Sequence, residues 1–485
     1  MSLQLYQNIS LSLLTDLSQL TMAYSHWRSK TFNLEAVFHL YFRETPFGGG
    51  FVVACGLENV IDFVQNFSFT QSDIDYLNTL RDSKNNPLFE KEFLLFLQNL
   101  SLLVDIDAVE EGNIVFPNEP LLRITGNIIA CQLLTSTLLN IINYQSLIAT
   151  KAARITLAAK YACVVEMGLR RSQGIDGAIS ASRAAYIGGC TATTNVLAGK
   201  LLGIPVRGTH SHAWIMSFTD ELDAFLAYAQ MMPDNCYFLV DTYNTLAGIE
   251  NAIKVGNWLA KNNFKLLGIR LDSGNLLELS QKARKLLDIA GLKEVEILAS
   301  SDLDEHKIKI LIEKEAPVNI WYVGTRLVTA FDDPALKGVF KLSGIKDKSG
   351  YWSYKMKLSD DISKNSLPGP LQVRRFAKDG KYLGDMLFNV DMEKVSDEMY
   401  LPQTIDPMKM DQADSHKDLL IPIFSKGRLV YPLPPLSTIR QNTKVQLEKF
   451  EAKIKKMNDP ATFPVGLEEK LFRIRQDLAA ALNKP

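Results

Sequence analysis

The stretch YFLVDT at residues 237–242 is followed along the chain by LLGIRLDSG at 266–274, EILASSD at 296–302 and VNIWYVGTR at 318–326. Each stretch is a short apolar run that ends in polar residues. Helical patterns lie between them, most clearly at 276–290. Apolar strands that alternate with helices are typical of a parallel sheet built from βα units, so these stretches predict the fold of the middle of the chain.

Polar residues stand where each of these predicted strands ends. Asp241, Asp272 and Asp302 follow one another at intervals of roughly thirty residues, which suits consecutive βα units. Such a sheet either closes into a barrel or stays open and doubly wound, and both folds keep their chemistry at the carboxyl ends of the strands. A single aspartate in this position is usually a helix cap, and Asp302 is a plausible cap for the following helix. Because several polar ends occur together, we expect an α/β barrel whose mouth holds a site.

The length of the chain predicts more than one domain. At 485 residues it exceeds a single ordinary core. Strand-like runs also lie outside the βα units, at 36–43 and 371–376. We therefore expect residues 151–335 to form the α/β barrel, and residues 1–150 and 336–485 to form a second, strand-rich domain that ends in helices.

The composition is that of a globular protein without a strong net charge. Hydrophobic residues make up 47% and charged residues 22% of the chain, and the formal net charge is −1. This excludes a global basic field, so we expect neither nucleic acid nor a membrane as a partner. Residues 1–20 contain Asp16 and no basic region, which makes a poor signal peptide, and the apolar stretch 128–142 is too short and too polar to span a membrane. Five dispersed cysteines suit reduced thiols, which predicts a cytoplasmic protein.

A turn with two histidines, GTHSHAW at 208–214, follows the apolar run 201–206. Its glycine lets the backbone approach a ligand closely. A histidine in such a turn can act as a nucleophile, a base or a phosphate partner. The alternative is an ordinary polar turn in which His210 and His212 are both solvated.

The polar strand ends contain residue types that suit phosphate chemistry. Carboxylates are ligands for magnesium, and arginines bind phosphate in a bidentate manner. The sequence has no Cys/His cluster for zinc, no Ser-His-Asp order and no P-loop lysine motif. We therefore expect phosphate chemistry with magnesium at the barrel mouth. The residues concerned are Arg171, Thr209, His212, Asp241, Arg270, Asp272, Ser301, Thr325 and Arg326.

Motifs that share one family pattern extend over nearly the whole chain. They read LLTDLSQLTMA, FRETPFGGGF, VFPNEPLLRI, NYQSLIATKAARI, EMGLRRSQG and SASRAAYIGG up to residue 189, and NVLAGKLLGIPVRGTHSHAW, LVDTYNT, GIRLDSGN, ASSDLDE and VGTRLVT from residue 195 onward. In this order and number they resemble the nicotinate phosphoribosyltransferase family. The resemblance implies a type II phosphoribosyltransferase fold, which is an irregular α/β barrel with an α+β domain built from both ends of the chain. It also implies a homodimer with active sites shared at the interface.

The reaction implied by the resemblance joins nicotinate to phosphoribosyl pyrophosphate. The products would be nicotinate mononucleotide, for NAD biosynthesis, and pyrophosphate, with Mg²⁺ present and with ATP hydrolysis coupled to the transfer. In this family the second histidine of the GT-x-x-H turn is phosphorylated by ATP, which implies a phosphohistidine at His212. The added charge would shift the enzyme to a state that binds substrate more tightly. His210 occupies a variable position of the motif and has no implied role.

The resemblance also implies roles for other residues of the mouth. Asp241 and Asp272 would act as catalytic residues that hold the metal or the ribose hydroxyls. Arg171 and Arg270 would hold phosphate or the nicotinate carboxylate, and Thr209 would contact the base. Further substrate contacts are expected from Ser301, from Gly324 and Thr325 at the 5′-phosphate, and from Arg43, which would reach the neighbouring subunit's site.

The chain departs from the family pattern around the expected base pocket. Family members usually have tyrosine where this chain has Ser18 and phenylalanine where it has Met167, and those two rings would sandwich the pyridine. Their loss would cost base binding on the order of 1 kcal/mol each, although methionine packs on a ring through its polarisable sulfur. Cys190 and Thr191 also replace a usual Phe-Asp pair.

These departures leave two alternatives to a nicotinate enzyme. One is a phosphoribosyltransferase for nicotinamide or another heterocycle. The other, from a different class, is a non-catalytic binding paralogue. Retention of His212, Arg270 and Asp272 argues against the second alternative, because a protein without catalysis has little need for this set.

Overall fold

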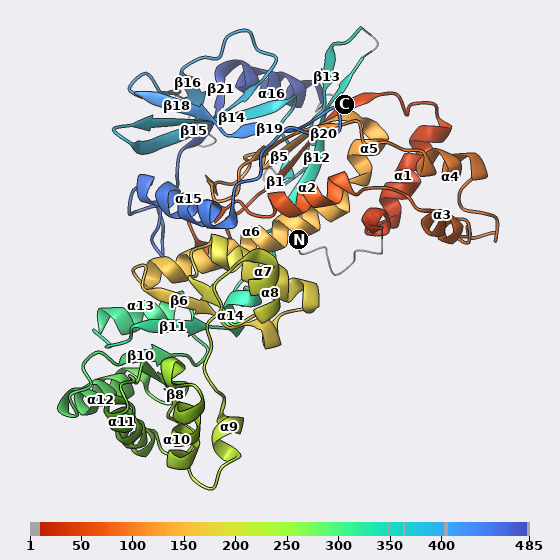
Figure 1. Ribbon diagram of the computed structural model, residues 1–485. Coiled ribbons are helices and arrows are strands. Elements are labelled where there is room, and N and C mark those ends of the chain that lie inside the picture. Colours follow the sequence, from red (N-terminus) through yellow and green to blue (C-terminus); the bar gives the residue numbers. More distant parts are fainter. Residues whose placement is uncertain (1–9, 348, 362–363, 402–405, 483–485) are drawn as a thin grey trace. The chain divides into compact units, whose positions relative to one another are not determined.

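The structure is a computed structural model in which the chain divides into two compact units (Figure 1). It describes residues 10–347, 349–361, 364–401 and 406–482. The first unit comprises Met1–Leu147 and Ala335–Pro485, and the second comprises Ile148–Pro334. Both ends of the chain therefore build one unit and the middle builds the other, which confirms the expected α/β fold with a second α+β domain.

The second unit contains a curled, six-stranded parallel sheet. Its strands are β6 (Cys163–Glu166), β7 (Ala192–Thr193), β8 (Tyr237–Leu239), β9 (Gly268–Leu271), β10 (Glu296–Ala299) and β11 (Ile320–Val323). They lie in the order β7-β6-β11-β10-β9-β8, and each neighbouring pair is parallel. β7 and β8 are the two edges of the sheet, which is therefore an open, curled half-barrel. The expected irregular α/β barrel is confirmed as this half-barrel.

Helices follow these strands, and several of them begin at side-chain caps. Asn244, Asn275 and Asp304 precede three of the helices, and their side chains accept hydrogen bonds from first-turn N–H groups. The expectation that Asp302 is a cap is therefore wrong: Asp304 has that role, and Asp302 adopts a left-handed backbone conformation with φ 50°. The helices of this unit are α7 (Ile175–Ile187), α8 (Val196–Leu202), α9 (His212–Met216), α10 (Glu221–Met231), α11 (Thr245–Lys261), α12 (Leu276–Ile289), α13 (Glu305–Glu313) and α14 (Thr325–Val328).

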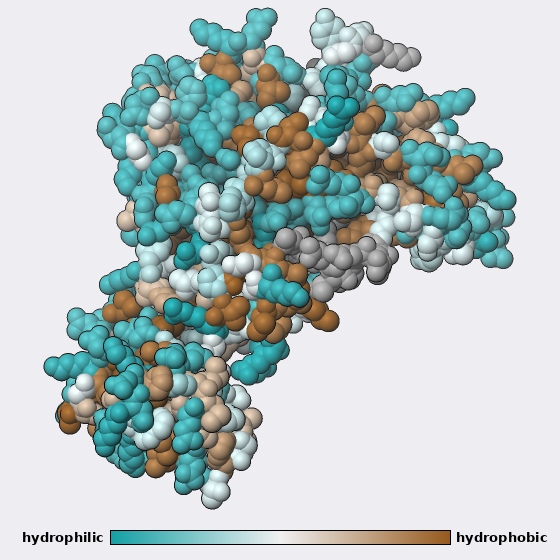
Figure 2. All heavy atoms as spheres, in the orientation of Figure 1, coloured by the Kyte–Doolittle hydropathy of each residue, from teal (hydrophilic) through white to brown (hydrophobic). Residues whose placement is uncertain are grey.

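The helices pack on the sheet through one apolar face. In α12 the buried residues are Leu276, Ser280, Ala283 and Leu287, which share one side of the helix. The face of α12 that is visible in Figure 2 is mostly hydrophilic. This packing of helices on the sheet fixes the strands and thus the positions of their carboxyl ends. A site at these ends is therefore built on rigid elements.

Strands from both ends of the chain form the larger sheet of the first unit, with the three N-terminal strands in the middle. Its order is β13-β12-β1-β5-β3-β19-β20, and β1 lies between the C-terminal strand β12 and the N-terminal strand β5, antiparallel to both. This pairing explains why the two ends fold as one unit. The strands are β1 (Glu35–Phe42), β3 (Asp105–Val109), β5 (Leu122–Asn127), β12 (Gly338–Lys346), β13 (Trp352–Tyr354), β19 (Leu420–Ser425) and β20 (Arg428–Leu429).

A second sheet of the first unit has the order β17-β16-β21-β15-β14-β18. Its strands are β14 (Leu371–Lys378), β15 (Lys381–Asn389), β16 (Glu398–Tyr400), β17 (Met408–Lys409), β18 (Ser415–Asp418) and β21 (Val465–Glu468), and a separate pair is formed by β2 (Val52–Val53) and β4 (Ile114–Val115). The remaining helices are α1 (Leu17–Arg28), α2 (Leu57–Gln65), α3 (Gln71–Leu77), α4 (Lys91–Gln98), α5 (Ile128–Leu133), α6 (Thr135–Ala158), α15 (Leu436–Lys449) and α16 (Glu469–Leu482).

The apolar stretch expected to be too short for a membrane span forms α5 and the start of α6. Across the described parts of the chain, the structure contains no helix with both the length and the apolar character that crossing a bilayer requires.

Candidate active site

Two aspartates meet where β8 and β9 end. Asp241 and Asp272 stand at the carboxyl ends of these strands. The backbone N–H of Asp272 donates to Asp241 Oδ2 over 3.1 Å, and the Ser273 hydroxyl donates to the same oxygen over 2.5 Å. The structure thus joins two of the residues that the sequence predicted for the mouth.

Arg270, on β9, forms hydrogen bonds with three residues of the mouth. Its Nη2 donates to Asp272 Oδ1 over 3.0 Å, its Nη1 to Thr209 Oγ1 over 3.1 Å and its Nε to Ser300 Oγ over 3.0 Å. The buried guanidinium also lies 5.7 Å from the centre of the Tyr322 ring. A planar guanidinium fixed on three sides presents its remaining N–H donors in a defined direction, which suits recognition of a carboxylate or phosphate.

Asp272 stands between Arg270 and His212. Its Oδ1 accepts from Arg270 and from the Ser300 hydroxyl, whereas its Oδ2 lies 4.0 Å from His212 Nε2. The side chain of Asp272 is 27% exposed and that of His212 is 41% exposed. Both groups are therefore accessible to a ligand, in contrast to the buried arginine that orients Asp272.

His212 is the first residue of α9, and Thr242 orients its ring. Its Nδ1 lies 3.1 Å from Thr242 Oγ1, which follows Asp241 at the end of β8. This contact uses Nδ1 and leaves Nε2 on the side of Asp272. The ring is thus held by one nitrogen and available at the other.

His210 has a different environment from His212. It is buried among the rings of Phe225, Tyr228 and Phe238. Its Nε2 accepts a hydrogen bond from the Leu239 N–H over 3.2 Å, so the ring proton is on Nδ1. Burial lowers the pKa of His210 to about 4. The alternative interpretation of a turn with two solvated histidines is therefore wrong, because one of them is part of the core.

The carboxylate of Asp241 carries an oxygen suited to a cation or a hydroxyl donor. Its Oδ1 is buried and accepts no hydrogen bond from any described residue, and a buried acceptor left without a donor is costly. The described residues contain no group of three or more His, Cys, Asp or Glu side chains that could enclose a metal ion. Mg²⁺ is usually held by one or two carboxylates together with substrate phosphates, so Asp241 and Asp272 fit this ion.

The loops after β10 and β11 contain further predicted residues. Ser301 has a positive φ of 94°, an uncommon conformation for a residue with a side chain. Gly324 follows β11, and a Cβ atom there would lie 2.9 Å from the Met167 carbonyl oxygen, so this position requires glycine. Thr325 begins α14. Met167 follows β6 and packs against the cluster that contains Tyr322.

Three further predicted residues lie outside the segments that follow β8 to β11. Arg171 is exposed at the end of the short 3-10 helix Leu169–Arg171, which follows β6. Ser18 is exposed on α1, and Arg43 directly follows β1, so both belong to the first unit.

Sequence reasoning missed Glu166 on β6. Its Oε2 accepts hydrogen bonds from the hydroxyls of Ser182 at 2.9 Å and Thr193 at 2.6 Å, and its Oε1 accepts from the Gly168 N–H. This buried carboxylate fixes the turn after Met167. A glutamate at the end of an apolar run gave no signal for this, because its partners lie on α7 and β7. Thr242 and Ser300 were also missed, although both directly adjoin predicted polar strand ends.

The fold and the mouth define the class of protein: an α/β-barrel enzyme in which arginine, carboxylate and histidine side chains meet at the carboxyl ends of parallel strands. Family models match residues 13–143 as the nicotinate phosphoribosyltransferase N-terminal domain, residues 163–384 as the nicotinate phosphoribosyltransferase family, and residues 372–475 as its C-terminal domain. The chain belongs to the nicotinate phosphoribosyltransferase family.

Relatives resemble the chain over almost its full length. The nicotinate phosphoribosyltransferase of Bacillus subtilis is 41% identical over 471 residues, which cover 96% of this chain and 94% of the relative. That of Homo sapiens is 32% identical over 537 residues, with 96% of each chain covered. The crystal structure of human nicotinic acid phosphoribosyltransferase matches with a TM-score of 0.84 at 30% identity, covering 96% of this chain and 99% of the other.

Proposed function

We propose that the protein transfers a phosphoribosyl group from phosphoribosyl pyrophosphate to nicotinate, which forms nicotinate mononucleotide for NAD biosynthesis and releases pyrophosphate. The observation that carries this proposal is the mouth in which Arg270 is fixed by Thr209, Asp272 and Ser300. It occurs in a chain whose full-length relatives are named for this activity.

In the transfer step, the bond from ribose C1′ to pyrophosphate breaks as the bond from C1′ to the pyridine nitrogen forms. Arg270 would bind the nicotinate carboxylate or a phosphate, and Thr209 would contact the base. Gly324 and Thr325 would receive the 5′-phosphate. Ser301 and Arg171 would add further substrate contacts.

The acidic pair of the mouth would serve the ribose and the leaving group. Asp241 and Asp272 would hold Mg²⁺ or the ribose hydroxyls. When bound, Mg²⁺ neutralises part of the negative charge of pyrophosphate. The buried Asp241 Oδ1, which has no donor among the described residues, supports this role.

ATP hydrolysis would be coupled through His212. The nucleophile would be Nε2, because Thr242 occupies Nδ1 and the ring is open to solvent. A bond from Nε2 to the γ-phosphorus would form as the bond to ADP breaks, and water would later release phosphate. The transient phosphoryl group would favour the state that binds substrate more tightly.

A homodimer that shares its active sites, in the cytoplasm, completes the proposal. Ser18 would reach the base pocket and Arg43 the neighbouring subunit's site. Leu14 and Leu17, which are exposed large apolar residues next to Ser18, support an interface on this side of α1. Analytical ultracentrifugation measures the assembly, and a monomer at micromolar concentration would contradict it.

The activity is tested by incubating the protein with Mg²⁺, ATP, phosphoribosyl pyrophosphate and each candidate base, including nicotinate and nicotinamide, with identification of the nucleotide. We expect nicotinate mononucleotide. Formation of only nicotinamide mononucleotide would favour the alternative that Ser18 and Met167 suggest, and no nucleotide from any base would favour the binding paralogue.

The phosphohistidine is tested with γ-labelled ATP. We expect acid-labile label on the wild type and its loss in His212→Ala, whereas the core variant His210→Gln keeps it. Equal labelling of wild type and His212→Ala would refute this step while leaving the phosphoribosyl transfer intact.

A further inference from the structure

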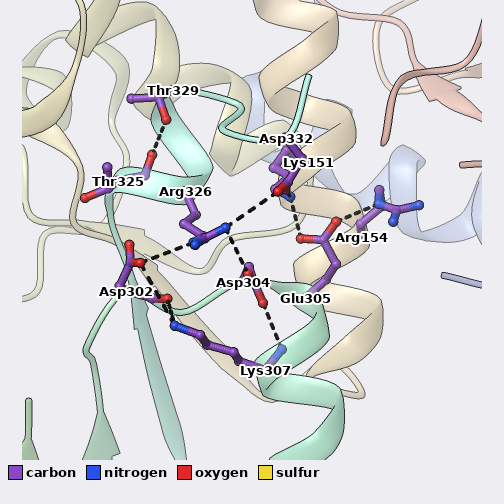
Figure 3. A network of polar contacts seen from close by, with 10 residues as sticks. All are labelled: Lys151, Arg154, Asp302, Asp304, Glu305, Lys307, Thr325, Arg326, Thr329 and Asp332. Carbon is purple, nitrogen blue, oxygen red and sulfur yellow. Dashed lines mark hydrogen bonds and ion pairs between the residues drawn. The ribbon is translucent and has the colours of Figure 1, made fainter. Parts of the chain in front are cut away.

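Arg326, the second residue of α14, lies between the loops that follow β10 and β11 (Figure 3). Its Nε lies 3.2 Å from Asp302 Oδ2, and its Nη1 lies 3.6 Å from both Asp304 Oδ2 and Asp332 Oδ1. The guanidinium also covers the ring of Phe331, 4.2 Å from its centre. The side chain therefore ties one loop to the other.

A buried ion network anchors this connection. Lys151 on α6 contacts both Asp332 and Glu305, with 2.7 Å between Lys151 Nζ and Glu305 Oε2. Arg154, one turn further along α6, places its Nε 2.8 Å from Glu305 Oε1. The side chains of Lys151 and Glu305 are fully buried, so this end of the network cannot move without exposing or unpairing a charge.

The surroundings of Arg326 argue against a direct role in anion binding. Three carboxylates face its guanidinium, so a phosphate brought to it would meet negative charge and would have to displace existing ion pairs. The same contacts suit a residue that fixes the chain around it.

The loop after β10 needs such a restraint. Ser301 and Asp302 have φ angles of 94° and 50°, and two successive residues with side chains in this region are strained. Arg326 holds the carboxylate of Asp302, and Lys307 Nζ donates to the Asp302 carbonyl oxygen over 2.9 Å. Arg326 also directly follows Thr325, the first residue of α14.

We propose that Arg326 is a positioning residue that holds Ser301 and the Gly324-Thr325 turn in one arrangement, so that both loops contact the same phosphorylated sugar. This rests on the proposed function, which assigns the 5′-phosphate to Gly324 and Thr325. Arg326 itself does not touch the substrate.

The test compares steady-state kinetics of Arg326→Met and Asp302→Asn with the wild type, using whichever base the wild type accepts. A phosphate contact that is lost equally from the bound substrate and from the transition state raises KM and leaves kcat unchanged. We expect each substitution to raise KM for phosphoribosyl pyrophosphate about tenfold or more, while KM for the base and kcat stay within about twofold. Lys309→Met, which removes an exposed ion pair with Glu313 on α13, is the matched control and should match the wild type.

The Asp302→Asn variant separates positioning from direct binding. If Arg326 bound phosphate, removal of a competing carboxylate would lower KM for phosphoribosyl pyrophosphate; positioning predicts a rise. The double variant should be no worse than Arg326→Met alone, because both substitutions break one connection. Unchanged KM in Asp302→Asn and Arg326→Met, or an equal rise in KM for the base, would overturn the proposal. Inactive wild type would instead count against the proposed function.

Discussion

An arginine with two neighbouring acidic residues occurs in both units, in opposite environments. At the mouth, Arg270 pairs with Asp272, and Asp272 meets Asp241. In the first unit, Arg375 on β14 pairs with Asp385, its cross-strand neighbour on β15, through Nε at 2.8 Å and Nη2 at 2.5 Å. The same residue types therefore build an open cluster in one place and a closed one in the other.

The cluster of the first unit is shut off from water. Arg375 is 2% exposed and Asp385 is fully buried. Four aromatic rings surround the guanidinium at 5.0 to 5.9 Å from their centres. They belong to Phe116, Tyr382, Phe450 and Phe463. A ligand has no access to these charges, so they serve the fold.

Burial also decides how many charges each cluster holds. Burial, and then the neighbouring Asp385 carboxylate, raise the pKa of Glu119 well above its ordinary value. A protonated Glu119 would leave one guanidinium against one carboxylate, and the buried cluster would then be neutral. At the mouth, solvent reaches Asp272, and the additional acidic group is available for a cation or a sugar hydroxyl. Residue type alone therefore does not distinguish a site from a structural cluster, whereas accessibility does.

Asp385→Ala should have the largest effect on stability. It leaves the Arg375 charge buried without its partner, which costs about 3–5 kcal/mol. Native-state hydrogen exchange of the β14 and β15 amides measures this loss locally, where a single transition for the two-unit chain would not. Exchange protection in the variant close to that of the wild type would show that the Arg375 cluster is dispensable for stability. The buried cluster would then not serve the fold, and it would not differ from the mouth in this respect.

Asp272→Asn should have the opposite profile. The substitution keeps the size of the side chain but removes the charge that faces His212 and pairs with Arg270, so we expect kcat/KM to fall on the order of 100-fold or more. Because Asp272 is partly exposed, the free energy of unfolding should change by only about 1 kcal/mol. A comparison of activity and thermal unfolding in this variant and Asp385→Ala tests whether function and stability reside in different clusters.

The repetitive part of the fold could be read from the sequence. The four apolar runs become β8 to β11, and the helix expected at 276–290 is α12. Asp302 and Asp304 stand two positions apart, and the sequence alone does not show which of them caps the helix. The left-handed backbone of Asp302 decides for Asp304. Likewise, a parallel sheet was predictable, but its open edges depend on which strands pair in space.

The candidate site was predictable in its residue types and only partly in its contacts. Asp241, Arg270 and Asp272 were expected at strand ends, and they meet there. The ion pair of Arg154 with Glu305 joins positions 151 residues apart, so no local pattern indicates it. The burial of His210 depends on rings from α10 and β8, which explains why two histidines of one turn differ in a way that the sequence did not show.

Glu119→Gln should have the smallest effect, and its sign depends on pH. Glu119 has an ordinary pKa of 4.5, and the folded state raises it. Below pH 4.5 the carboxyl group is protonated in both states, so the variant and the wild type should differ little. Above pH 4.5 the unfolded wild type releases a proton that the folded state retains, so its free energy of unfolding falls as the pH rises towards the folded-state pKa. Glutamine cannot titrate, and it keeps an oxygen to accept the Phe116 N–H, as Glu119 Oε2 does at 2.9 Å.

We therefore expect Glu119→Gln to gain stability relative to the wild type as the pH rises above 4.5, in hydrogen exchange of β14 and β15. Glu278→Gln, measured in the exchange of the α12 amides, is the control of opposite sign, because the exposed Glu278 has its pKa lowered by a hydrogen bond from Lys282. A Glu119→Gln variant that loses stability relative to the wild type as the pH rises would mean that Glu119 is charged in the fold. The buried cluster would then hold two carboxylates, as the mouth does, and exposure would no longer explain the difference between them.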